Sequence, residues 1–375
     1  MTSHRQYKIT PLALEKIKAH LTQAYPKEGC GLLAGDDTGF IEEIFRAVNS
    51  TTTDRSSGHY EIDPLLLYEL EKKAEEKGYS ILAITDHNVF IPHNDLTEAD
   101  FLMLNGIEYN LDPHDGSART CHFCAIAKDP ETVLQPFFHR TDYCFSGAIE
   151  ARKSVRFDPS KPDYVRTYSH EGVSEMMKGC AEAGFFVTYN HPVWSLERYP
   201  EYMGYEGMHA IEMVNNGSTV FGYPEYNETV YDDMLTGGKQ VFCIAADDNH
   251  IVARDSFGAY TVIGAPALEY KAVTDALFAG TFYCSTGAAI DEMYIEDGTL
   301  YVKTPPVREI RVFTGARYAK WLHGTREMPV TELCFDLTDP RCRYFRVTVT
   351  DFDGGCAYSN AYYPAALGVT AREKP

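Results

Sequence analysis

The sequence predicts an α/β protein built on a parallel barrel, followed by a small β-sandwich. Three observations support this fold class. Several apolar runs end in Asp, Glu, His or Asn, helix-like and strand-like segments alternate along the middle of the chain, and short alternating strands replace this pattern after residue 288. Buried parallel strands are continuous apolar runs, and parallel barrels carry their chemistry where such strands end.

The apolar runs bring metal-binding residue types to their carboxyl ends. The runs are Ser80–His87, Gly106–Glu108, Phe185–His191, His209–Val214 and Val241–His250. If these strands form one barrel, their Asp, Glu and His side chains meet at one rim. Imidazole and carboxylate ligands suit Zn, Mn or Fe, and two or more such ions can clamp a phosphoryl group and activate a water.

The remaining elements follow from periodicity and capping residues. A helix is expected from Ile9 to Ala24, where apolar residues recur at helical spacing. Asp63 and Pro64 predict the start of another helix, which ends near Lys77. The other expected elements are strands at Gly29–Gly35 and Phe40–Val48, helices at Glu171–Ala183 and Leu268–Ala279, and C-terminal strands at Ile290–Ile295, Leu300–Lys303, Ile310–Phe313, Glu332–Leu337 and Tyr344–Thr350.

Residues 135–170 show weak periodicity and are rich in aromatic, Arg and Pro residues. We expect this stretch to be a long insertion over the rim, because long loops of this kind often form lids. The predicted domains are therefore 1–48, a barrel over 49–288 and a β-sandwich over 289–367. The insertion is where substrate specificity is expected to lie.

Composition limits the function classes. The net charge of −20 and the lack of any run of Lys or Arg argue against a protein that grips nucleic acid or an anionic membrane by charge. No segment approaches the roughly 20 apolar residues that a spanning helix needs, so a cytoplasmic protein is expected. The ten cysteines are scattered. Cys121 and Cys124 have redox or zinc spacing, but alternation on a strand explains that spacing more simply.

The ordered motifs resemble the PHP (polymerase and histidinol phosphatase) family of metal-dependent phosphoesterases. The resemblance covers residues 80–290, and it rests on four motifs in sequence order: Thr85–Asn88, Gly106–Glu108, Asn190–Pro192 and Asp248–His250. It implies a distorted seven-stranded (β/α) barrel that holds two or three divalent ions and hydrolyses phosphate esters.

The resemblance also implies residue roles. Glu108 would be the bridging carboxylate, with His122 and His191 completing one metal site. His87 and His250 would serve a second ion and Asp248 a third. Asp86, His87, Glu108 and Asp248 are the expected catalytic residues, Glu212 is expected to support the ligands, and the phosphate is expected on an arginine, for which the candidates are Arg140, Arg198 and Arg254.

Simpler interpretations exist for several of these residues. Asp86 and Asp247 could cap the helices that follow their strands. His122 lies within an apolar strand that could bury it without a metal. Each arginine could form a surface ion pair instead of binding phosphate.

The N-terminal part departs from the PHP pattern. PHP proteins open with a strand that ends in His-x-His, but Asn49 and Thr51 stand at those positions here, and His59 is the nearest histidine that could compensate. One metal site is therefore expected to be weakened or lost.

Residues 7–83 resemble instead the first half of a JAMM (MPN) metalloprotease domain, in which Glu28 would be the general acid/base. The zinc site of that family is incomplete in this chain, since Val89 and Phe90 stand where the second His and the Pro of its His-x-His-Pro motif are expected. We interpret the chain as a hybrid of an MPN-like segment and a PHP-type barrel.

The sequence therefore predicts a hydrolase that acts on a small phosphorylated metabolite or nucleotide. The alternative is a degenerate, non-catalytic barrel that binds a ligand or a partner protein. An isopeptidase of the JAMM type ranks third, because it would need a zinc ion near Glu28. Metal content and phosphatase activity distinguish the first two hypotheses.

Overall fold

The computed structural model describes residues 8–9, 16, 30–35, 40–47, 77–250 and 252–372. It divides the chain into two compact units: Met1–Ser80 with Asn249–Ser256, and Ile81–Asp248 with Phe257–Pro375. The helix expected at Asp63–Lys77 and the residues Glu28, Asn49, Thr51 and His59 lie outside the described residues, as does all of the expected N-terminal helix except its Ile9 and Lys16.

The first unit contains a three-stranded sheet in the order β1-β3-β2. Strand β3 (Phe40–Ala47) pairs with β2 (Cys30–Gly35) in antiparallel fashion and with β1 (Lys8–Ile9) in parallel. The two longer strands confirm the strands expected in this region. Helix α8 (Val252–Asp255) belongs to the same unit.

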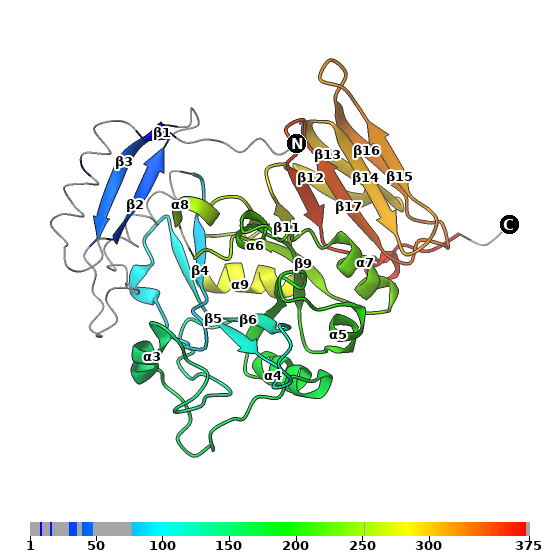
Figure 1. The fold of residues 1–375 in the computed structure, drawn as a ribbon. Helices are drawn as coiled ribbons and strands as arrows, with labels where there is room; N and C mark the ends of the chain where they lie inside the picture. The colour runs from blue at the N-terminus through cyan, green and yellow to red at the C-terminus, as the bar shows by residue number, and fades with distance from the viewer. Residues whose placement is uncertain are drawn as a thin grey trace. The chain divides into compact units, whose positions relative to one another are not determined.

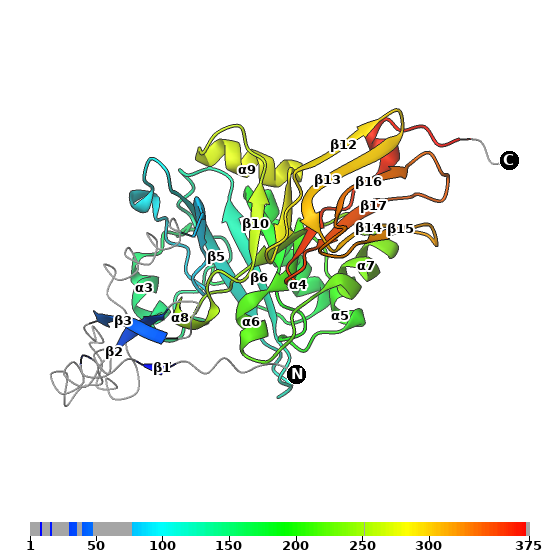
Figure 2. The same cartoon turned by 90° about the horizontal axis from the view of Figure 1, so that it is seen from above.

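The second unit is built on a six-stranded sheet in the order β4-β5-β6-β7-β8-β9 (Figures 1 and 2). The strands are β4 (Ile81–Ile84), β5 (Leu102–Leu111), β6 (Cys121–Ala127), β7 (Phe185–Tyr189), β8 (Ala210–Asn215) and β9 (Phe242–Ala246). Each of the five apolar runs thus contributes a strand, as expected.

The predicted (β/α)7 barrel is nevertheless wrong. Strand β6 runs antiparallel to both β5 and β7, and within the described residues the end strands β4 and β9 do not pair with each other. The connection between β5 and β6, residues 112–120, is too short for the crossover of a dozen or more residues that a parallel pair needs. The sheet is therefore an open, mixed sheet.

One face of this sheet is apolar at one end of its strands and polar at the other. Leu102 and Leu104 of β5 and Phe186 of β7 pack with apolar residues of α9 (Tyr270–Ala279). Further along the same strands, the same alternation brings Glu108 and Asn190 to this face. One end of the face is thus an apolar core, and the other end is polar.

The opposite face is covered by α4 (His170–Glu182). The Ser169 hydroxyl caps this helix by accepting a hydrogen bond from the Gly172 amide. Val173, Met176 and Cys180 of α4 share a core cluster with apolar residues of β5, β6 and β7. Both helices expected in this part of the chain, α4 and α9, are confirmed.

The shorter helices lie in the connections between strands, except for η3, which follows the last strand. They are η1 (Asn94–Leu96), α3 (Ala148–Ala151), η2 (Arg152–Ser154), α5 (Tyr199–Gly204), α6 (Asn216–Val220), α7 (Glu228–Thr236) and η3 (Pro364–Leu367). In the part of the chain that the structure describes, no helix has the length and apolar character needed to cross a membrane.

The C-terminal strands form two sheets that share an apolar core (Figure 1). One sheet has the order β12-β13-β16 and the other β10-β11-β18-β17-β14-β15. The strands are β10 (Tyr260–Ile263), β11 (Phe282–Ser285), β12 (Glu292–Glu296), β13 (Thr299–Val307), β14 (Glu309–Thr314), β15 (Lys320–His323), β16 (Val330–Asp336), β17 (Phe345–Thr350) and β18 (Cys356–Ser359).

The larger C-terminal sheet extends beyond residues 289–367, the bounds expected for the β-sandwich. Strands β10 and β11 precede residue 289, yet they belong to the larger of the two sheets. Buried Arg346 of β17 donates to Asp232 of α7 at 2.8 Å. The C-terminal strands and the six-stranded mixed sheet thus belong to one compact unit.

Candidate metal centre

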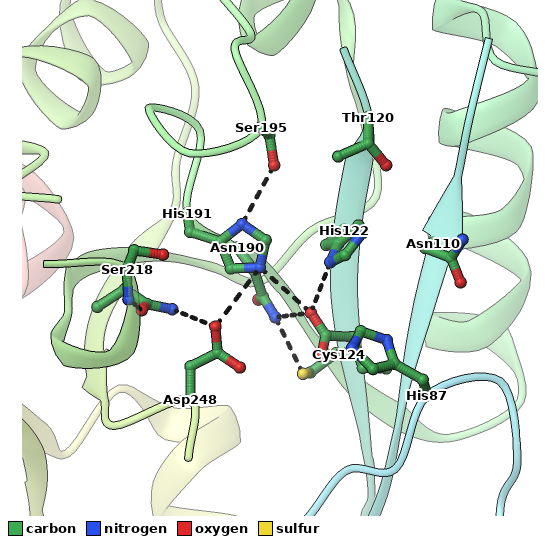
Figure 3. A network of polar contacts seen from close by, with 12 residues as sticks. His87, Asn110, Thr120, His122, Cys124, Asn190, His191, Ser195, Ser218 and Asp248 are labelled. Carbon is green, nitrogen blue, oxygen red and sulfur yellow. Dashed lines mark hydrogen bonds and ion pairs between the residues drawn. The ribbon is translucent and has the colours of Figure 1, made fainter. Parts of the chain in front are cut away.

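Glu108 contacts three histidines at the polar end of the sheet, and Figure 3 shows these histidines, His87, His122 and His191, close together. The Glu108 carboxylate is 4% exposed. Glu108 Oε1 is 3.1 Å from His122 Nδ1 and 3.3 Å from His191 Nε2, and Glu108 Oε2 is 3.6 Å from His87 Nε2. The ligand atoms of His87, Glu108 and His122 all lie within 4.8 Å of one another. This group is the candidate metal triad.

The strand register brings these residues together. His87 lies three residues after the end of β4 and bridges Glu108 of β5 in parallel. Across β5 and β6, Glu108 is opposite Cys124, and Asn110 is opposite His122. Paired residues share a face of the sheet, and side chains alternate along a strand. The side chains of Glu108, Cys124, Asn110 and His122 therefore all lie at the polar end of one face.

His191 and Asp248 complete the cluster from β7 and β9. His191 Nε2 is 3.9 Å from Asp248 Oδ2. Both residues have positive backbone φ, 25° for His191 and 50° for Asp248, and Asn88 beside His87 has a φ of 64°. Such conformations are costly for residues other than glycine and occur often at functional sites.

The close approach of α6 to Asp248 requires a glycine. The Gly217 amide donates to the Asp247 carbonyl at 2.7 Å. A Cβ atom on Gly217 would lie 2.6 Å from the Asp248 carbonyl oxygen and 2.8 Å from that of Asp247. The Asp247 carboxylate accepts three backbone amides, those of Phe257, Gly258 and Ala259. Asp247 thus has a structural role, but it binds the backbone that follows α8 instead of capping the start of a helix.

Several polar residues hold the ligand candidates in place. His191 Nδ1 is 3.1 Å from Ser195 Oγ, which directs Nε2 towards Glu108. The His191 amide donates to Glu212 Oε2 at 2.9 Å. Asn215 donates to both Glu212 and Asp248, at 2.9 and 3.2 Å. Partners of this kind fix the orientation of metal ligands.

Glu212 therefore supports the ligand candidates, as expected. The sequence analysis gave no such supporting role to two further residues, Asn190 and Cys124. Asn190 donates to Glu108 Oε1 at 3.4 Å and to Cys124 Sγ at 3.0 Å. The sequence signals for these two residues were the position of Asn190 before His191 and the position of Cys124 two residues after His122.

The protonation states of Glu108 and His191 depend strongly on their charged neighbours. Burial by itself would raise the pKa of Glu108, but hydrogen bonds from His122 and His191 hold it well below its usual value. Burial by itself would lower the pKa of His191, but Glu108, Glu212 and Asp248 raise it to about 10. Without a metal ion, the Glu108 carboxylate therefore lies beside a His191 imidazolium. The positive charge of that imidazolium lies where a cation would bind.

Glu212 behaves differently from Glu108. Burial raises its pKa to about 8, and the nearby charge of Asp248 acts in the same direction. The Glu212 carboxyl is therefore largely protonated at pH 7. A divalent cation bound nearby would favour its ionised form.

Three of the expected catalytic residues, His87, Glu108 and Asp248, lie in this cluster. Asp86 is exposed at the end of β4, and its backbone carbonyl accepts the Glu108 amide at 3.2 Å. The structure thus brings together five of the predicted metal ligands: His87, Glu108, His122, His191 and Asp248. The sixth, His250, belongs to the other compact unit, because that unit includes Asn249–Ser256.

The arginines expected to bind phosphate have other partners. Arg140 is exposed and forms an ion pair with Asp163 at 2.7 Å. Arg198 is exposed and donates to the Glu197 carbonyl at 3.0 Å. Arg254 is exposed and belongs to the first unit. Arg140 and Arg198 each satisfy nearby acceptors in their own segments. Phosphate binding by any of the three arginines stays a prediction.

Comparisons with family models, with curated proteins and with solved structures found no match. The function is therefore argued from the site itself. Its imidazole and carboxylate donors fit a first-row divalent ion such as Zn, Mn or Fe.

Proposed function

We propose that this protein is a metal-dependent phosphoesterase that hydrolyses a small phosphorylated metabolite or nucleotide. The observation that carries the proposal is the group formed by half-buried His87 with buried Glu108 and His122, whose ligand atoms lie within 4.8 Å of one another. His191 and Asp248 adjoin this group. The order of these residues in the chain, which resembles the PHP family, supports a phosphate ester as the substrate.

In this proposal, His87, Glu108 and His122 hold a divalent ion. Such an ion would polarise a phosphoryl oxygen and lower the pKa of a water molecule. Glu108 is suited to the role because its low pKa keeps it ionised. Asp248 would accept a proton from the attacking water, and Asn215, which donates to Asp248 at 3.2 Å, would orient its carboxylate. The proposal includes a second or third ion, which His191 and Asp248 would bind.

A non-catalytic binding protein is the second candidate. One observation favours it: among the described residues, a single group of three offers ligand atoms close enough to hold a metal. A mononuclear site with few open positions could bind a ligand without hydrolysing it. An isopeptidase ranks third, because Glu28 lies outside the described residues.

Metal content and hydrolysis of the purified full-length chain test the proposal. We expect bound Zn, Mn or Fe by elemental analysis, and metal-dependent hydrolysis of 4-nitrophenyl phosphate or a nucleotide. Glu108→Gln should weaken Mn²⁺ binding by roughly a hundredfold and abolish hydrolysis, because it removes the central negative charge. Asp353→Asn, which changes a carboxylate with 86% side-chain exposure, serves as the matched control.

The two candidates give different results. Tight metal binding without hydrolysis of any phosphate ester would favour the binding protein. If the wild-type chain binds no divalent metal, or if Glu108→Gln binds Mn²⁺ as tightly as the wild type, the phosphoesterase proposal is wrong.

A further inference from the structure

Two exposed aromatic side chains flank the histidines of the candidate metal centre. Phe145 is 46% exposed and Trp194 is 38% exposed. The Phe145 ring is 5.3 Å from the His87 ring, and the Trp194 ring is 5.3 Å from His122 and 5.0 Å from His191. Apolar rings therefore adjoin the metal-ligand candidates from two separate segments of the chain.

The Trp194 segment is held rigidly. Backbone amides of Val193 and Trp194 donate to the carboxylate of Glu225, at 2.9 and 2.8 Å. Glu225 is fully buried, and Asn227 donates to it at 2.9 Å. Leu196 has a φ of 59°. A buried carboxylate and a left-handed backbone thus fix a loop whose tryptophan remains partly exposed.

The Phe145 segment is fixed by different contacts. It belongs to the 135–170 insertion, and Tyr143 and Ser146 on either side of Phe145 have φ values of 69° and 50°. The Tyr143 carbonyl accepts Asn88 Nδ2 at 3.0 Å, and the Tyr143 hydroxyl accepts the Arg166 amide at 2.9 Å. The Arg166 guanidinium lies 4.2 Å from the centre of the Tyr143 ring.

Arg166 anchors this segment to the sheet. It is 6% exposed, and its Nη1 donates to Asn88 Oδ1 at 2.5 Å and to the Asn110 carbonyl at 2.7 Å. Asn88 follows His87, and Asn110 is opposite His122. The contacts that hold the Phe145 loop therefore end on neighbours of the metal-ligand candidates.

We propose that Phe145 and Trp194 bind a planar aromatic group of the substrate, so that the preferred phosphate esters carry an aryl or heteroaryl group. This inference rests on the proposed phosphoesterase function. Aromatic rings offer large flat surfaces with specific stacking geometry, and binding sites combine such surfaces with a few polar groups. Rigid loops that keep both rings partly exposed beside the cluster are suited to a flat ligand, since little ordering is needed on binding.

Binding of two phosphonates tests this inference. Trp321→Phe leaves Trp194 as the sole tryptophan, because the chain has two. Mn²⁺ is added first, and phenylphosphonate or methylphosphonate is then titrated while Trp194 fluorescence is recorded. We expect phenylphosphonate to change the emission and to bind at least about tenfold more tightly than methylphosphonate.

Variants of the two rings provide the controls. Phe145→Ala should reduce the preference for phenylphosphonate severalfold while the Mn²⁺ affinity stays the same. Trp194→Phe, measured by calorimetry, should retain more of the preference than Trp194→Ala. These results would support the aromatic subsite.

Two other results overturn the inference in distinguishable ways. Equal binding of both phosphonates to the Mn²⁺-loaded protein, or a preference that Phe145→Ala and Trp194→Ala leave unchanged, would overturn the aromatic subsite and leave the phosphoesterase proposal intact. Failure to bind Mn²⁺ would remove the proposed function, and the aromatic subsite that rests on it would be lost too.

Discussion

His191 Nε2 lies 3.3 Å from Glu108 Oε1, although 83 positions separate the two residues in the chain. Both side chains are almost completely buried. A buried ion pair is strongly disturbed when one partner is removed, so each residue depends on the other. The pair thus joins the end of β7 to β5 at the polar end of the sheet.

Metal binding should release a proton from this pair. The pKa of His191 is raised to about 10, so the imidazole is protonated at pH 7 without metal. A cation beside Glu108 would displace that proton, and metal affinity should therefore rise with pH, by up to about tenfold per pH unit for one proton. Calorimetry of Mn²⁺ binding in buffers of different ionisation enthalpy measures the protons released.

His191→Gln is the informative variant for this prediction. The proton release at pH 7 should fall, because glutamine carries no titratable proton. Mn²⁺ binding by the wild-type protein without any proton release would contradict the prediction.

Glu197 should make stability depend on pH. This carboxyl is 2% exposed and accepts hydrogen bonds from the hydroxyls of Tyr168, Tyr189 and Tyr205. Burial raises its pKa from 4.5 to about 7. The folded state therefore keeps a proton that the unfolded state loses between these pH values, so the contribution of Glu197 to stability is greatest below pH 4.5 and falls as pH rises to about 7.

The size of this effect can be measured against a Gln variant. A raised pKa of this extent corresponds to roughly 3 kcal/mol. The free energy of unfolding of the wild type, relative to that of Glu197→Gln, should fall by up to that amount between pH 4.5 and pH 7 in denaturant titrations. A difference that stays constant over this range would show that the Glu197 carboxyl does not titrate there.

Arg166 should be more important for stability than Arg140. Arg166 is buried and donates to two acceptors at the sheet, whereas Arg140 is exposed and pairs with Asp163. Hydrogen bonds of charged groups contribute about 1.5–3 kcal/mol, but exposed ion pairs contribute roughly 0–1 kcal/mol. Arg166→Met should therefore lower the free energy of unfolding by a few kcal/mol on this basis, and Arg140→Met should change it little.

Limited proteolysis adds a local measurement. Arg166→Met should speed cleavage within residues 141–147, because the Tyr143 contacts hold that segment. Equal cleavage rates in the wild type and both variants would argue that Arg166 does not anchor the insertion.

The strands of the second unit were largely predictable from the sequence, but their directions were not. The runs that end at His87, His191 and His250 contain strands β4, β7 and β9. An apolar run looks the same whichever way its neighbours point, so the antiparallel placement of β6 could not be inferred from periodicity. The short 112–120 connection was the available signal.

Residue types at strand ends identified most of the candidate site. The sequence alone indicated that His87, His191 and Asp248 follow apolar strands, because burial of such strands leaves polar residues at their ends. Glu108 was also expected at a strand end, but it lies within β5. Only the tertiary structure decided that His122 belongs with them, that Arg166 rather than Arg140 contacts residues beside the cluster, and that Phe145 and Trp194 flank it. The physical reason is that strand register and loop packing depend on contacts between distant residues, which local sequence patterns do not encode.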